Sequence, residues 1–221
     1  MRIPADVTYP MPSGARQPDE GPPWRPVRDR AVVLVHDMQR YFLDFFRPGT
    51  SPRDDLVRNV AALLDAARAA GIPVFYTAQP GAMSAADRGL LRDLWGPGMS
   101  AEPRHREILP EVAPKHGDTV LTKWRYSAFS RTDLLERMTD LGRDQLVICG
   151  VYAHIGCLMT AVDAFSADIQ PFLVADALAD FSPRYHALAL DYARDRCAAT
   201  PVTADLLRTF VPETERSGHA G

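Results

Sequence analysis

The chain has 221 residues, 46% of them hydrophobic and 24% charged, and a formal net charge of −3 at pH 7. This length and composition suit one large globular domain, and the small negative charge gives no indication of a nucleic-acid partner. The three cysteines lack regular spacing, which argues against a disulfide framework and against a zinc site. No apolar run is long enough to cross a membrane, and the first residues do not have the pattern of a signal peptide. We therefore expect a cytoplasmic protein without a membrane partner.

Residues 1–30 contain seven prolines, which forbid a continuous helix. We interpret this segment as a proline-rich N-terminal arm that either wraps the domain or a partner subunit or is loose. The domain itself is expected over residues 31–211, and residues 212–221 are expected to form a frayed, flexible tail.

Short apolar runs rich in β-branched residues predict strands, and the runs at 31–35 and 145–149 are expected to be buried, as the central strands of a parallel sheet are. The predicted strands are residues 31–35, 74–77, 119–122, 145–149 and 171–175, with a short last strand near 198–202.

Helices are predicted between these strands from capping residues and apolar periodicity. Ser51, Ser130 and Ser182 are interpreted as N-caps of three helices, because each precedes a capping-box acid or a proline and then an apolar stripe. Two further helices are predicted from Leu158 and near residues 204–210.

Two segments show no periodicity: an aromatic-rich loop at residues 41–46 and a long section at residues 82–114. A connection as long as the second is usually a functional loop or lid. Because strands and helices otherwise alternate, we predict a doubly wound, three-layer α/β/α domain with a mostly parallel central sheet.

Polar side chains follow four of the predicted strands, at the point where each strand ends: Asp37, Gln79, Lys123 and Tyr152. In an open α/β sheet these ends share one edge, where ligands bind. An acid and a lysine suffice for general acid–base chemistry on an anionic substrate. Each residue alone also has an ordinary explanation, Asp37 and Gln79 as turn residues and Lys123 as a solvated surface cation.

The stretch 149–157 is predicted to be a tight strand-to-helix turn whose free N–H groups favour an anion, although every α/β domain also has plain turns of this kind. Within it, Cys157 is either a nucleophile or, as we favour, a buried inert thiol. His36 would indicate a metal only with further ligands at suitable spacing, and none is found.

Six segments, in this order along the chain, resemble the isochorismatase family. They are HDMQRYF (36–42), YTAQP (76–80), WGPG (95–98), KWRYSAF (123–129), GVYAHIG (150–156) and DIQPFLVADA (168–177). The resemblance covers roughly residues 3–210. It implies an ether hydrolase that forms no covalent intermediate.

The wider superfamily includes nicotinamidases, which use an Asp-Lys-Cys triad and bind a metal through histidines after the second strand. Asp37 and Lys123 match the first two triad members, but the nucleophile position falls on Gly156, and residues 78–80 contain no histidine. The resemblance therefore implies neither a cysteine nucleophile nor a metal, and no other cofactor is expected. A cysteine hydrolase that uses Cys157 stays as an alternative that thiol alkylation would test.

By this resemblance Asp37 is the catalytic acid, with Lys123 beside it. It protonates the enol methylene of the substrate, water adds to the oxocarbenium ion, and the hemiketal collapses to pyruvate and a ring alcohol. Burial would raise the pKa of Asp37 and Lys123 would lower it, a sum that the sequence leaves open. Gly156 is interpreted as room for substrate or water.

The resemblance also implies which residues contact the substrate. Polar contacts are expected from Gln79, Arg88, Lys123, Tyr152 and the Gly156 backbone N–H, and apolar walls from Phe42, Trp95 and Tyr126. The family often has a non-proline cis peptide at the position of Val151-Tyr152.

Two substrates compete. Residues 40–43 and 88–91 favour 2-amino-2-deoxyisochorismate, which gives trans-2,3-dihydro-3-hydroxyanthranilate for phenazine-type secondary metabolism. Residues 156–157 and 176–180 fit equally well with isochorismate, which gives 2,3-dihydro-2,3-dihydroxybenzoate for siderophores. We favour the amino substrate. The expected partners are a small anionic chorismate-derived substrate and a second copy of the chain, as a homodimer. A catalytically inactive scaffold is the remaining alternative.

Overall fold

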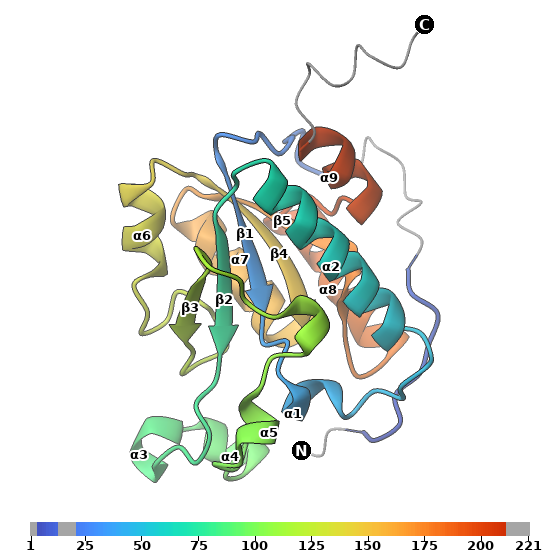
Figure 1. Cartoon of the computed structure of the whole chain (residues 1–221), viewed down its shortest axis with the longest axis vertical. Coiled ribbons are helices and arrows are strands. Elements are labelled where there is room, and N and C mark those ends of the chain that lie inside the picture. The colour runs from blue at the N-terminus through green and yellow to red at the C-terminus, as the bar shows by residue number, and fades with distance from the viewer. Residues whose placement is uncertain (1–3, 13–20, 211–221) are drawn as a thin grey trace, which may run out of the picture.

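The structure is a computed structural model that describes residues 4–12 and 21–210 (Figure 1). Its centre is a five-stranded, fully parallel sheet in the order β3-β2-β1-β4-β5. The strands are β1 (Ala31–His36), β2 (Val74–Ala78), β3 (Thr119–Thr122), β4 (Gln145–Val151) and β5 (Gln170–Ala179). The predicted doubly wound α/β/α fold is confirmed.

Helices cover both faces of this sheet. They are α1 (Arg40–Leu43), α2 (Arg53–Ala69), α3 (Ala85–Arg88), α4 (Leu91–Trp95), α5 (Pro103–Arg106), η1 (Pro110–Val112), α6 (Leu134–Asp140), η2 (Ala153–Cys157), α7 (Leu158–Ser166), α8 (Pro183–Arg196) and α9 (Thr203–Phe210). Of these, η1 is a single 3-10 turn and η2 is π-helical.

The two faces of β1 build two separate cores, because successive side chains of a strand point to opposite sides. Val33 and Val35 pack with residues of α2 and α9 on one face. Val32 and Leu34 pack with residues of α6, α7 and α8 on the other. All six residues of β1 are buried, which explains why its sequence shows no polar alternation.

Four predicted elements differ in the structure. The aromatic-rich loop contains α1, the section 82–114 contains α3, α4, α5 and η1, and β5 continues past Ala175 to Ala179. The strand near 198–202 does not form. Ala199 pairs with Phe172, but Pro201, the next residue that should donate to β5, has no N–H.

One of the three predicted N-caps is confirmed. The Ser182 hydroxyl accepts a hydrogen bond from the Tyr185 N–H at 3.3 Å. Ser51 is not a cap, because α2 begins at Arg53 and the Ser51 hydroxyl accepts from the Met11 N–H instead. Ser130 lies four residues before the start of α6 and does not cap it.

The described part of the N-terminal arm packs on the domain. Val7 pairs with Phe46, and the Tyr9 hydroxyl accepts a hydrogen bond from the Asp180 N–H at 2.8 Å and contacts His186 Nδ1 at 3.0 Å. The predicted tail, residues 212–221, lies outside the described residues. None of the described helices combines the length and the apolar character that crossing a membrane requires.

Candidate active site

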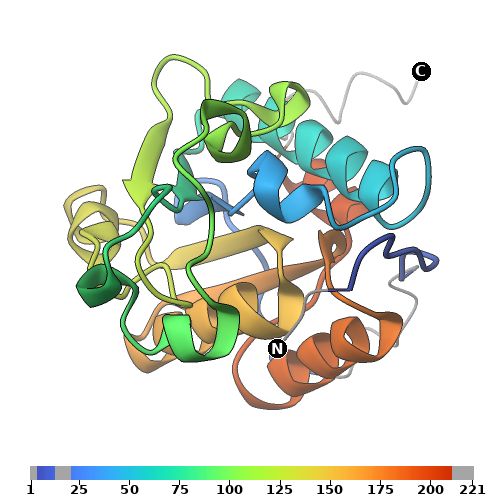
Figure 2. The same cartoon turned by 90° about the horizontal axis from the view of Figure 1, so that it is seen from below.

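A cavity of about 570 Å³ opens at the carboxyl ends of the strands, the edge toward which the arrowheads in Figure 1 point. Figure 2 looks onto this edge, with α1 and the short green helices around it. All nine residues predicted from the sequence line this one cavity: Phe42, Gln79, Arg88, Trp95, Tyr126, Tyr152 and Gly156, together with Asp37 and Lys123. Pro4 and Ala5 of the arm also line it.

A larger and more open hollow of about 730 Å³ lies elsewhere, between the arm and the end of α8. Its acidic side chain, Asp195, is half exposed and already pairs with Arg194. We place the candidate site in the smaller cavity, because buried charges there converge on one point.

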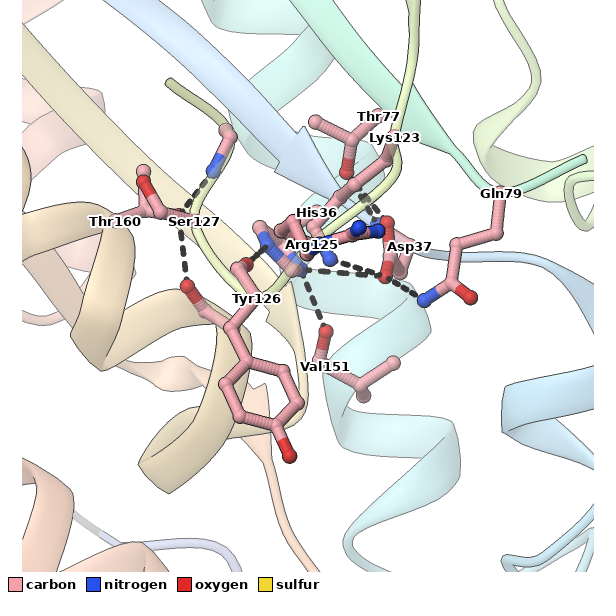
Figure 3. A network of polar contacts seen from close by, with 12 residues as sticks. His36, Asp37, Thr77, Gln79, Lys123, Arg125, Tyr126, Ser127, Val151 and Thr160 are labelled. Carbon is pink, nitrogen blue, oxygen red and sulfur yellow. Dashed lines mark hydrogen bonds and ion pairs between the residues drawn. The ribbon is translucent and has the colours of Figure 1, made fainter. Parts of the chain in front are cut away.

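Asp37 is at the centre of the polar group that we call the floor: Asp37, Thr77, Gln79 and Lys123. Its carboxylate accepts hydrogen bonds from Lys123 Nζ at 3.0 Å, the Thr77 hydroxyl at 2.6 Å and the Gln79 side-chain amide at 3.2 Å (Figure 3). Asp37 is 4% exposed and Lys123 2%. Asp37 has a φ of +51°, a left-handed conformation that turns the chain out of the sheet directly after β1.

These contacts decide the charge of Asp37. Burial raises the pKa of Asp37, but the ammonium of Lys123 and the hydrogen bonds from Thr77 and Lys123 outweigh it and hold the pKa below its ordinary value. Burial lowers the pKa of His36 to about 4, so this neighbour is neutral near pH 7 and adds no charge. The carboxyl of Asp37 is therefore an anion in the free protein.

Arg88 is a second buried cation that lines the cavity. It is 7% exposed, and burial lowers the pKa of its guanidinium. Its nitrogens donate to the Gly96 carbonyl at 3.2 Å and to the Gln79 side-chain oxygen at 3.4 Å, both neutral acceptors. No carboxylate of the described residues lies within ion-pair distance of it. A buried charge without a counter-charge is costly, which makes this a site for an anionic ligand.

Arg88 belongs to the segment that we call the strap, residues 82–107. At Gly98 of the strap, a Cβ would lie 2.7 Å from the Arg88 guanidinium carbon, so this turn can close around the cation only as glycine. Trp95 Nε1 donates to the Tyr126 hydroxyl at 2.7 Å and joins the strap to the loop after β3.

Gln39 anchors both ends of the strap, and sequence reasoning missed it. Its side-chain amide donates to the carbonyls of Gln79 at 3.0 Å and Arg106 at 2.9 Å, and its oxygen accepts from the Gln79 N–H at 2.8 Å. Thr77 was missed as well, although alternation along the strand places its side chain on the same face as that of Gln79.

Tyr152 and Phe42 form part of the apolar wall. The Tyr152 hydroxyl donates to the Phe42 carbonyl at 2.8 Å, so its proton is committed within the protein and does not serve a ligand. The Tyr152 ring packs against Phe181 with 4.3 Å between ring centroids. The expected cis peptide at Val151-Tyr152 is present.

Gly156 does not serve the purpose that the sequence analysis gave it. A Cβ at this position would lie 2.1 Å from Cε1 of His36, so the missing side chain makes room for the imidazole and not for a ligand. Cys157, the next residue, is fully buried in the core formed with α6, α7 and α8. Burial raises the pKa of the Cys157 thiol well above its usual range, which suits an inert side chain. Among the described residues, no group of three or more His, Cys, Asp or Glu side chains is arranged to hold a metal ion.

Comparisons with known proteins identify the family of the chain. The family model of the isochorismatase domain matches residues 31–205. The chain is 54% identical to the phenazine biosynthesis protein PhzD1 of Pseudomonas aeruginosa over 206 residues, 93% of this chain and 98% of that protein. It is 53% identical to the isochorismatase of Bacillus subtilis over 94% of this chain, but spans only 66% of that longer protein. A cysteine hydrolase from Pseudomonas syringae shares the fold, with a TM-score of 0.78 and 24% identity over 86% of this chain and 96% of that one.

Proposed function

The chain belongs to the isochorismatase family of hydrolases, and we propose that it cleaves the enolpyruvyl vinyl ether of 2-amino-2-deoxyisochorismate. The products are trans-2,3-dihydro-3-hydroxyanthranilate and pyruvate. One observation carries the proposal: a carboxylate held by three donors and a buried arginine, which has no carboxylate partner among the described residues, face the same cavity.

The substrate suits this pair because it carries two carboxylates on a cyclohexadiene ring. Arg88 binds one of them in place of its weak neutral contacts. The second carboxylate draws the ammonium of Lys123 away from Asp37. With less positive charge nearby, burial dominates and the pKa of Asp37 rises, so the carboxyl takes up a proton as the substrate binds.

The protonated Asp37 then acts as general acid. It transfers its proton to the enol methylene, which becomes a methyl group, and the ether carbon becomes an oxocarbenium ion that the aspartate anion stabilises. Water adds to this carbon and returns one proton to Asp37. The hemiketal then expels the ring alcohol and leaves pyruvate.

A covalent route is not supported. Position 156 has no side chain that could attack the substrate, and the Cys157 thiol lies in the core instead of lining the cavity. Water is therefore the nucleophile in the proposed reaction.

The amino substrate is supported by the likeness to a phenazine biosynthesis protein over nearly the full length of both chains. The likeness to an isochorismatase supports the competing substrate, isochorismate, which gives 2,3-dihydro-2,3-dihydroxybenzoate. The two substrates differ by one polar group, so both fit the same acid and the same two cations.

The test is pyruvate release from both substrates, with the wild type beside Asp37→Ala. A much higher kcat/KM on the amino substrate, abolished in the variant, is the expected result. Preference for isochorismate would move the protein to the siderophore type with the mechanism unchanged. Release that is unaffected in Asp37→Ala would overturn the mechanism, and no release from either substrate by the wild type would favour an inactive scaffold.

We further propose that the protein acts in the cytoplasm as a homodimer. Light scattering coupled to size-exclusion chromatography tests the assembly, because a monomer of this chain has a mass of 24.4 kDa. A mass near twice that value is expected, and a monomer at working concentration would contradict it.

A further inference from the structure

His36 is the last residue of β1 and directly precedes Asp37, yet the proposed reaction does not use it. Its imidazole is 1% exposed, and Nδ1 lies 2.7 Å from the Val151 carbonyl oxygen. The ring is neutral near pH 7, because burial lowers its pKa to about 4. Nε2 lies farther from its nearest acceptor, 3.4 Å from the Tyr126 carbonyl oxygen, so Nδ1 carries the proton and donates it to Val151, the last residue of β4, which lines the cavity.

Two glycines lie against His36: Gly150 of β4 against its backbone, and Gly156 of η2 against its ring. At Gly150 a Cβ would lie 2.2 Å from the His36 carbonyl oxygen, and at Gly156 it would lie 2.1 Å from Cε1 and 2.7 Å from Nε2 of the ring. Gly150 also has a φ of +114°, which side chains rarely adopt. Figure 3 shows the His36 ring between Asp37 and Val151. The His36 imidazole is thus interlocked with residues 150–156 by close packing against Gly156 and by the hydrogen bond to Val151.

We propose that His36 is a positioning residue for the reaction: its imidazole, seated against Gly156 and bonded to Val151, fastens residues 150–156 to the end of β1 and holds Asp37 at its reacting position. The inference rests on the proposed function. Asp37 leaves the sheet in a left-handed conformation, so the backbone before it needs an anchor that does not move. The Nδ1 atom lies 3.9 Å from the Asp37 carboxylate, near enough that a shift of the ring displaces the acid.

The first test uses two amides that differ in reach. His36→Asn places an amide nitrogen as many bonds from Cβ as Nδ1, so it can donate to Val151, whereas His36→Gln places it one bond farther, where Nε2 stands. We expect His36→Asn to keep most of the wild-type kcat. We expect His36→Gln and His36→Ala to lose about a hundredfold in kcat, with KM changed much less, as misplacement of a reacting group does. Equal kcat values in all three variants would overturn the positioning role.

The second test is a double-mutant cycle with Gly156→Ala. In the wild type the added methyl group meets the ring, so both Tm and kcat should fall steeply. In the His36→Asn background Cε1 and Nε2 are gone, so the same change should cost little more. Equal losses of Tm in both backgrounds would contradict the interlock. Because Tm is measured without substrate, the Tm comparison tests the interlock even if neither chorismate derivative is turned over. The absence of turnover would count against the proposed function alone.

His186 provides a matched control. It is also fully buried, with Nε2 3.0 Å from the carbonyl oxygen of Ala175 in β5, but it does not line the cavity. We expect His186→Asn to lower Tm while the kcat of the folded protein stays at the wild-type value. If His36→Gln behaves like this control, His36 has only a structural role and the proposal is wrong.

Discussion

The floor and the strap line one cavity and meet where Arg88 donates to Gln79, but the charges of the two regions are handled in opposite ways. The floor rises from the ends of β1, β2 and β3, and its two ions, Asp37 and Lys123, are paired with each other at 3.0 Å. The strap is a chain of short helices between β2 and β3, and its buried cation, Arg88, donates to neutral acceptors alone within the part of the chain that the structure describes. A satisfied pair is set before any ligand arrives, whereas an unpaired cation gains most from a ligand. We therefore assign the chemistry to the floor and much of the binding to the strap.

The largest effect is expected from a substitution in the floor. Asp37→Asn keeps the shape of the side chain but removes the acid, so kcat should fall about 10²–10⁴-fold while KM changes little. The change also leaves Lys123 buried without its counter-ion, and Tm should fall. Steady-state pyruvate release and thermal unfolding measure the two effects. Rates must be compared at a temperature where circular dichroism shows the variant to be folded; an unchanged kcat there would mean that another group supplies the proton.

The next largest effect is expected from a substitution in the strap. Arg88→Met keeps the apolar stem and removes the charge, so KM should rise by about 10–100-fold, the value of a charge-assisted hydrogen bond of about 1.5–3 kcal/mol. The kcat value should stay within a few-fold, because the floor is untouched. Arg88→Lys is the matched control, since it restores a point charge but not the bidentate hydrogen bonding of a guanidinium to a carboxylate. It should recover only part of the affinity. A loss confined to kcat would instead place Arg88 in the chemistry.

Sequence reasoning succeeded for the floor because a strand and the residue at which it ends can be recognised from the adjacent sequence alone. Runs such as residues 31–35 and 119–122 predict strands, the first buried and the second at the exposed edge of the sheet, and parallel strands bring their carboxyl ends to one edge. Asp37, Gln79 and Lys123 could therefore be placed together before any contact was known. Ser182 was also placed correctly, because a cap acts on its own helix.

It failed where tertiary contacts decide the conformation. The strap helices have only four or five residues, too short to be stable alone, and no periodic pattern marks them. Gly156 was interpreted as space for a ligand because nothing in the sequence shows that the His36 ring, 120 positions earlier, fills that space. The protonation state of Asp37 likewise depends on its contacts with Lys123 and Thr77, which the sequence does not show.

The pH dependence of the kinetic constants tests the floor in two states, because kcat/KM reports the free protein and kcat reports the complex with substrate. In the free protein the pKa of Asp37 is lowered, so between about pH 5 and about pH 8 the protonated fraction, and with it kcat/KM, should fall about tenfold per pH unit. In the complex the pKa is raised, so kcat should stay level to a higher pH than kcat/KM. Lys123→Met removes a lowering influence and should move the fall of kcat/KM to higher pH. Two flat profiles over this range would contradict the assignment of Asp37 as the acid.

The smallest effect concerns the joint between the two regions. Tyr126 follows β3 on the floor side, and its hydroxyl accepts the hydrogen bond from Trp95 Nε1 of the strap at 2.7 Å. Tyr126→Phe removes only this bond, worth about 0.5–1.5 kcal/mol, so KM should rise a few-fold at constant kcat.

Trp95→Phe removes the same bond from the other side together with part of the wall. If the bond joins strap and floor, the two changes should be less than additive in the double variant, because each already abolishes the shared contact. Full additivity would mean that the two side chains act on the ligand independently, and that other contacts, such as those of Gln39 and Arg125, hold the strap.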